Sequence, residues 1–200
     1  MTGVQTCALP ILGGNSLSDL LVFGKLAGEY AAKYARENRA GEVHAREVDD
    51  ARAQALAAFD RPSGESPFKI QQELQDLMQD KVGIIRDEKE MLQALDALEG
   101  FKKRAQAASI DGNRHYNPGW HTAVDLHNML VCSEAVTRCA IERKESRGAQ
   151  ARADYPDKDD AHSKFNLIAV KGPDGRMQVR KQPVVAIRED LVKIIEENQK

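Results

Sequence analysis

The sequence predicts a mainly α-helical fold: one docking helix, an antiparallel bundle of about three to four helices, and a small C-terminal β-hairpin. Long segments repeat apolar residues at helical spacing, which is typical of amphipathic helices. Aromatic residues are only 5% of the 200 residues, so the core must consist mainly of Leu, Ile, Val and Ala. Near the C-terminus, two short segments that read as strands flank residues 172–175 (GPDG), which favour a hairpin turn.

The balance of charge argues against two classes of partner. The chain carries 29 Lys and Arg residues against 31 Asp and Glu residues, a formal net charge of -2. No excess of positive charge is available to recruit nucleic acid or an anionic membrane surface. A membrane-spanning helix needs about 20 apolar residues in succession, and no segment is that long and apolar. We therefore expect no nucleic-acid partner and no direct membrane insertion.

The three cysteines are Cys7, Cys132 and Cys139. An odd and sparse count favours no disulfide framework and fits a reducing compartment. Cys132 and Cys139 are seven residues apart on a predicted helix and should share one face. We expect them to be small buried apolar residues, with a redox or metal pair as the alternative.

The chain opens on a segment unlike the rest. Residues 1–11 (MTGVQTCALPI) contain no charge and no helical period. We interpret them as a non-native leader, with an ordinary chain terminus as the alternative. A helix is then predicted over residues 16–38, because Ser16 and Asp19 form a capping-box pattern after two glycines. Small residues, including Gly24 and Gly28, form a stripe along it that permits close approach to another element.

The central segment predicts four more helices. They cover about residues 44–59, 67–85, 87–108 and 118–143, with a linker at residues 60–65. In the helix over residues 67–85, Pro67 occupies the first position, and the apolar stripe ends at Ile85. In the helix over residues 87–108, residues 102–104 (KKR) are interpreted as a solvated helix end.

The last three of these helices each carry an apolar stripe. The stripes are, in chain order, Phe68, Ile70, Leu74, Leu77, Met78, Val82 and Ile85; Met91, Leu92, Leu95, Leu98, Phe101 and Ala105; and Trp120, Val124, Met129, Val131, Ala135, Val136 and Cys139.

The remaining segments are shorter. Residues 145–160 are polar and predict an irregular loop, residues 164–170 and 177–180 predict two strands, and residues 188–198 predict a terminal helix. The histidines at positions 115, 121 and 127 recur every six residues, which places them about 120° apart on a helix. That spacing does not favour a metal site, and we expect none.

The start of the first helix is the sharpest candidate for a binding site. A helix N-terminus offers free N–H groups and the positive end of the helix dipole, and flanking glycines allow a ligand to come close. These features indicate only that an anionic or polar ligand could dock there. An ordinary capped helix remains the alternative on this reasoning alone.

Two motifs carry a resemblance to a known family. Residues 12–24 (LGGNSLSDLLVFG) resemble the LGGNSLxDLxVFG segment of succinate dehydrogenase and fumarate reductase flavoproteins. About 110 residues later, residues 128–130 (NML), 145–149 (ESRGA) and 154–156 (DYP), together with Arg152, are similar to that family's NML…ESRGAHxRxDYP. Two long motifs in the right order are far more specific than either one. The resemblance covers the chain from Leu12 onward and is weakest over the last 30 or so residues.

The resemblance implies a C-terminal fragment of a flavoprotein oxidoreductase subunit. The implied FAD contacts are Ser16 and Leu17, with Asn15 and Gly14 beside them; no catalytic residue and no metal ligand is implied. The family's substrate-binding Arg corresponds to Ile11, and its other catalytic residues and dinucleotide-binding loop lie upstream. The chain alone should therefore be inactive.

For the complete protein, the resemblance implies interconversion of succinate and fumarate by hydride transfer with FAD, as part of electron transport and the tricarboxylic acid cycle. Electrons would pass to an iron–sulfur subunit and a quinone. Membrane-anchor subunits would hold the complex at the cytoplasmic face of the inner membrane, with a dicarboxylate as substrate.

The resemblance also implies a division into domains. Residues 1–11 would be the leader, 12–40 a remnant of the FAD-binding domain, 41–160 the helical bundle with the ESRG loop, and 161–200 the hairpin and terminal helix. We expect Arg147 and Arg152 to pair with carboxylates and to hold the helical domain against the flavin domain. Gln150 stands where the family usually has His. Two other interpretations remain open: a non-catalytic helical interaction module, and a fragment of L-aspartate oxidase.

Overall fold

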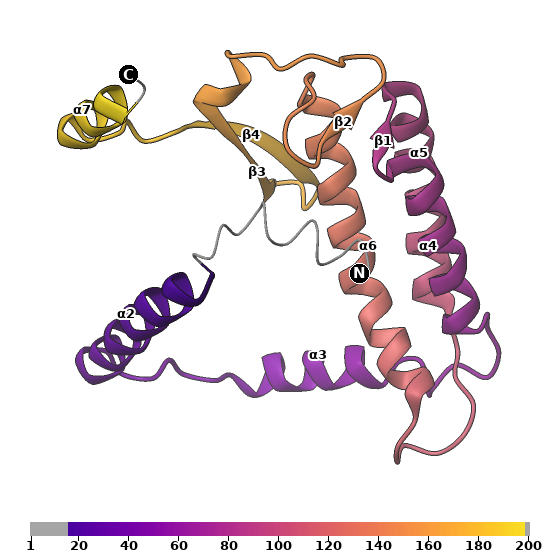
Figure 1. Cartoon of the computed structure of the whole chain (residues 1–200). Coiled ribbons are helices and arrows are strands. Elements are labelled where there is room, and N and C mark those ends of the chain that lie inside the picture. The colour runs from indigo at the N-terminus through magenta and orange to yellow at the C-terminus, as the bar shows by residue number, and fades with distance from the viewer. Residues whose placement is uncertain (1–15, 199–200) are drawn as a thin grey trace. The chain divides into compact units, whose positions relative to one another are not determined.

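The computed structural model describes residues 16–198, and the chain divides into two compact units between Ala51 and Arg52. The first unit contains helix α2 (Ser16–Glu37) and the start of α3 (Ala45–Leu56) (Figure 1). Along α2, large apolar side chains are exposed, and a Cβ added at Gly24 or Gly28 would meet no atom within 4 Å. The exposed residues of α2 are Leu17, Leu20, Leu21, Val22, Phe23, Leu26, Tyr30 and Tyr34.

The second unit is organised around a bundle of three helices: α4 (Pro67–Val82), α5 (Glu88–Ala107) and α6 (Pro118–Glu142). Each contacts the other two (Figure 1). Local signals set their starts: the Asp87 side chain accepts from the Lys89 N–H, and the Asn117 side chain accepts from the Trp120 N–H. The main core consists of Ile70, Leu74, Leu98, Phe101, Ala105, Ala108, Leu126 and Leu130.

Helix α4 is shorter than the apolar pattern predicts. It ends at Val82, and Ile85–Arg86 forms a two-residue strand, β1, that pairs in parallel with β2 (Ala151–Arg152). Gly83 leaves helical geometry with ψ -141°, and Asp87 begins the next helix. Ile85 is 71% exposed, so the prediction that it extends the buried stripe is wrong. Phe68 and Leu92, also assigned to stripes, are about half exposed.

The buried face of α6 also differs from the prediction. Val124, Val131 and Val136 are exposed, whereas the packed face is formed by Gly119, Ala123, Leu126, Leu130, Glu134, Thr137 and Ala140. Apolar residues lie on several sides of this helix, so periodicity does not single out one face. Small side chains on the packed face let α6 approach α4 and α5 closely.

The face of α6 that is buried also sets the exposure of the two cysteines on this helix. Cys132 is exposed and Cys139 is half-buried, so the prediction that both are buried is wrong for Cys132. No disulfide joins these two residues.

After the bundle, strands β3 (Phe165–Lys171) and β4 (Met177–Pro183) form the predicted antiparallel hairpin, which contacts α6. The register runs from Phe165 opposite Pro183 to Lys171 opposite Met177. Gly175 has φ 78° at the turn, a conformation that favours glycine. Helix α7 (Glu189–Asn198) follows, and a short 3₁₀ helix, η1 (His162–Lys164), precedes β3. The predicted fold class, a mainly α bundle with a C-terminal hairpin, is confirmed.

Across residues 16–198, none of the helices combines the length and apolar character needed to cross a membrane.

Candidate functional site

The predicted flavin segment lies at the edge of the described chain. Gly14 and Asn15 fall outside the described residues, as does the side chain of Ser16. The helix itself begins at Ser16, where the capping pattern predicts it, and carries Asp19 in its first turn. Leu17 follows on that turn and is 73% exposed. The FAD contacts of these four residues stay a prediction.

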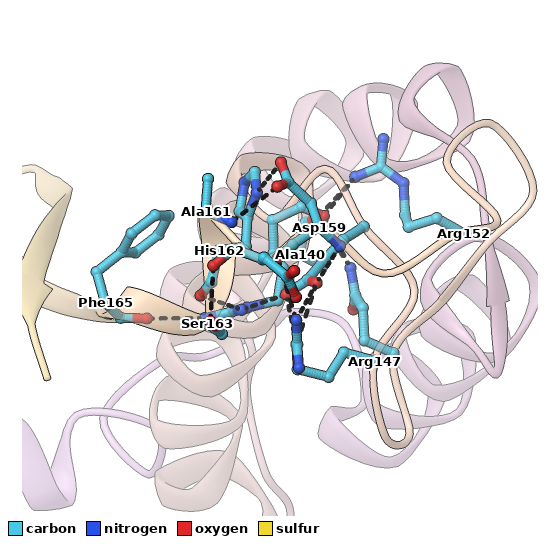
Figure 2. Close-up of polar contacts among 12 residues, drawn as sticks. Ala140, Arg147, Arg152, Asp159, Ala161, His162, Ser163 and Phe165 are labelled. Carbon is cyan, nitrogen blue, oxygen red and sulfur yellow. Dashed lines mark hydrogen bonds and ion pairs between the residues drawn. The ribbon is translucent and has the colours of Figure 1, made fainter. Parts of the chain in front are cut away.

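The second sequence motif forms an arginine-rich loop, here the ESRG loop, residues 143–162 (Figure 2). Glu145 lies at its centre with no exposed side-chain surface. Its carboxylate accepts from Arg143 Nη1 at 2.7 Å, from Arg147 Nε at 3.0 Å and from the Asp159 N–H at 2.9 Å. The hydrogen bond from Arg147 is the main cause that lowers the pKa of Glu145 to about 2, against burial, which raises it.

Arg152 is the second buried charged residue of the ESRG loop. Its side chain is fully buried and forms a two-pronged ion pair with Asp154, at 2.7 Å from Nε and 2.6 Å from Nη2. The remaining nitrogen, Nη1, donates to the Ala140 carbonyl at 2.7 Å and more weakly to those of Ile141 and Arg143. These are carbonyls at the end of α6, which no further helical turn satisfies. Arg152 therefore closes the C-terminus of α6 with a buried positive charge.

Backbone contacts tie the ESRG loop to the connection between α4 and α5. The Ala153 N–H donates to the Arg86 carbonyl at 2.8 Å, and the Glu88 N–H donates to Asp154 Oδ2 at 3.1 Å. Arg152 also lies 3.7 Å from Glu88. The prediction that Arg147 and Arg152 pair with carboxylates is confirmed. Their contact with a flavin domain stays a prediction.

Gln150, which departs from the family motif, links three elements. Its Nε2 donates to the carbonyls of Ala140 at 3.2 Å and Arg143 at 3.3 Å, and its Oε1 accepts from Arg86 Nη1. Sequence reasoning singled out Gln150 but not Arg86. The signal available for Arg86 was its place between an interrupted apolar stripe and the Asp87 cap.

The basic run at residues 102–104 is solvated only in part: Lys103 is exposed as predicted, whereas the prediction is wrong for Lys102 and Arg104, which are half-buried in ion pairs. Arg104 Nη2 lies 2.8 Å from Glu65 and 2.6 Å from Glu73, so it pairs with carboxylates before and within α4. Lys102 Nζ donates to Glu134 of α6 at 2.7 Å. Basic residues near a helix end predict solvation because they commonly lie there, but Lys102 and Arg104 find carboxylate partners outside their own helix.

The Glu134 carboxylate is 9% exposed and pairs with both Lys102 and Arg138. Burial raises its pKa, but the hydrogen bonds from these two cations outweigh burial and the pKa is lowered. Lys102 and Glu134 thus connect α5 to α6 as an ion pair.

In the described part of the chain, no group of three or more His, Cys, Asp or Glu residues is arranged to hold a metal ion. The predicted site residues lie in two places: the start of α2, and the ESRG loop, whose Arg143, Arg147 and Arg152 form internal ion pairs. Such a loop stabilises a domain and does not itself present a reactive group.

Comparison with known proteins shows which family this helical bundle, loop and hairpin belong to. The family model described as fumarate reductase flavoprotein C-term matches residues 71–194. The fumarate reductase flavoprotein subunit of Haemophilus influenzae is 34% identical over 178 residues, which cover 86% of this chain and 29% of that protein. The chain belongs to the succinate dehydrogenase/fumarate reductase flavoprotein family.

Two further comparisons agree. The succinate dehydrogenase flavoprotein subunit of Coxiella burnetii is 36% identical over 156 residues, covering 76% of this chain and 26% of that protein. The solved Mycobacterium smegmatis Sdh1 in complex with UQ1 is 40% identical, with a TM-score of 0.84, covering 93% of this chain and 32% of that one. The chain thus spans about a third or less of the length of these relatives.

Proposed function

We propose that this chain forms the C-terminal region of a flavoprotein that interconverts succinate and fumarate. The observation that carries the proposal is the match of residues 71–194 to the family model. Relatives named fumarate reductase and succinate dehydrogenase flavoprotein subunits align with 76–86% of the chain, which favours this activity over the L-aspartate oxidase interpretation.

FAD is the flavin proposed for the complete protein, with Gly14, Asn15, Ser16 and Leu17 as its contacts from this chain. The residues fit such a group because a 22-residue helix begins at Ser16 and its first backbone N–H groups have no partner within the helix. FAD, when bound, supplies the group that accepts or donates hydride. The helix start would stabilise negative charge on the flavin through the positive end of its dipole.

The ESRG loop would serve this function by holding the helical domain in one shape. Arg152, without exposed side-chain surface, ties the end of α6 to the start of α5, and the equally buried Glu145 holds Arg143, Arg147 and Asp159 together within the loop. We propose that electrons leave through an iron–sulfur subunit to a quinone, with membrane-anchor subunits completing a complex at the inner membrane. A relative solved with UQ1 and another named quinol-fumarate reductase support this kind of partner.

A chimera tests the proposal. Residues 12–200 would replace the matching C-terminal region of the Haemophilus influenzae fumarate reductase flavoprotein subunit. We expect the chimera to carry flavin absorbance and to reduce a dye with succinate, while the 200-residue chain alone does neither. A folded, flavin-bearing chimera without succinate or fumarate turnover would contradict the proposal. Turnover by the 200-residue chain alone would contradict the inference that the substrate site lies elsewhere in the protein.

A further inference from the structure

Arg86 differs from the other arginines around the ESRG loop in having no carboxylate partner among the described residues. Arg143 and Arg147 share Glu145, and Arg152 pairs with Asp154. Arg86 instead donates from Nε to the carbonyls of Val82 at 3.1 Å and Gly83 at 2.9 Å, and from Nη1 to Gln150.

This unpaired cation is partly buried. Burial and the nearby positive charge of Arg152 both lower the pKa of Arg86. A guanidinium remains charged at neutral pH, so its desolvation is costly unless an anion approaches it. Neutral partners satisfy Nε and Nη1 but supply no negative charge.

Arg86 lines a cavity of about 480 Å³ between α6, the ESRG loop and β3. Arg143, Gln150 and Asn166 contribute further polar groups to its wall, and Cys139 and Leu167 contribute a thiol and an apolar side. Among residues 16–198, no carboxylate-bearing residue lines it. The charged lining residues are thus both cations, and Arg86 is the one of the two that has no carboxylate partner among the described residues.

We propose that this cavity, the Arg86 cavity, binds a small oxyanion of the carboxylate or phosphate class. Arg86 would donate to the oxyanion from the N–H groups that Val82, Gly83 and Gln150 leave free, and the amide of Asn166 would add a neutral donor, because Arg143 already pairs with Glu145. The proposal rests on residues of the second unit alone, so it does not depend on the proposed function.

Anion binding in the Arg86 cavity can be measured through Cys139, because a bound anion would shield its thiol. With Cys7→Ser and Cys132→Ser in place, Cys139 is the one thiol left in the 200-residue chain. The measurement is the rate of Cys139 alkylation by neutral iodoacetamide while sodium phosphate or sodium acetate replaces sodium chloride at constant ionic strength. Thermal unfolding is followed in the same solutions, because a ligand that binds only the folded state raises the midpoint.

We expect phosphate, acetate or both to slow alkylation saturably by about threefold or more, with a rise in the unfolding midpoint of a few degrees. Arg86→Gln should abolish both effects. Arg180→Gln, which removes an exposed arginine of β4 outside the cavity, should retain them. The anion that protects identifies the class of ligand.

Arg86→Gln also removes contacts to the end of α4 and could unfold the chain. Arg86→Lys then decides, because lysine keeps the charge and loses the planar fork; we expect about tenfold weaker protection. The proposal is overturned if neither anion protects Cys139 saturably at tens of millimolar. It is equally overturned if the Arg86 variants are protected as well as the parent.

Discussion

Arg152 and Asp154, two residues apart in the sequence, form a two-pronged ion pair at 2.7 and 2.6 Å although the Arg152 side chain has no exposed surface. The same guanidinium donates to carbonyls at the end of α6. One side chain thus holds the ESRG loop and closes the longest helix of the bundle.

Arg152→Lys should destabilise the second unit strongly. Lysine keeps the charge but cannot bridge Asp154 and the Ala140 carbonyl, so buried groups lose their partners. We expect a loss of about 3–5 kcal/mol in the free energy of unfolding, measured by urea denaturation. Arg180→Lys on exposed β4 should change it by less than about 0.5 kcal/mol. Equal effects of the two variants would show that the buried pair contributes nothing.

Acid should destabilise the fold through the paired carboxylates. Hydrogen bonds from Arg147 and Arg152 lower the pKa of Glu145 and Asp154 to about 2, from ordinary values of 4.5 and 3.8. Because these folded-state values are depressed, the unfolded chain binds more protons as pH falls. Stability should be complete above about pH 5 and should decline progressively towards pH 2.

The variant Glu145→Gln checks the source of this dependence. It should be less stable at neutral pH, because Arg143 and Arg147 lose their shared partner, and its unfolding free energy should fall less between pH 6 and pH 3. Unfolding curves at several pH values measure both quantities. An unchanged slope in the variant would assign the acid sensitivity to other groups.

Leu98→Ala should lower the free energy of unfolding, because Leu98 lies in the core of the helical bundle. Leu98 is 0% exposed among helices α4, α5 and α6, so its truncation leaves a cavity and should cost about 2–5 kcal/mol. Leu92, on the same helix, is 52% exposed, and Leu92→Ala should cost less than about 1 kcal/mol. Thermal and urea unfolding of both proteins measure the difference. A larger cost at Leu92 would contradict the assigned face of α5.

Gln150 can be compared with the residue that the family usually has. In Gln150→His, one ring nitrogen can donate to a carbonyl while the other accepts from Arg86, so we expect a change below about 1 kcal/mol. Gln150→Ala leaves both sides without a partner and should cost about 1–3 kcal/mol. Urea unfolding distinguishes the two. Equal losses would mean that the side chain acts by its volume and not by its hydrogen bonds.

In the chimera described above, Ser16→Ala should lower the FAD content of the purified protein, because the predicted contact at the helix start is lost. Ser18→Ala, two residues further along the same helix, is the matched control and should leave it unchanged. Flavin absorbance relative to protein absorbance gives the ratio. Full FAD occupancy in both variants would remove Ser16 from the predicted contacts.

Much of the fold follows from local sequence. The helix starts at Ser16, Pro67 and Pro118, and the hairpin around Gly175, depend on capping, proline and turn chemistry within a few residues. The motif that contains Arg147 and Arg152 is also local in the sequence, and its composition predicts that these arginines pair with carboxylates.

Other features depend on residues far apart in the sequence. Arg104 meets Glu65 across 39 residues, and Arg86 meets Gln150 across 64 residues. The buried face of α6 is the one against which α4 and α5 pack, and small side chains on that face allow close packing. Sequence alone therefore determined the helices, the hairpin and the family. Only the tertiary structure decided which faces are buried and which charges meet, because burial and ion pairing depend on neighbours that chain order does not place.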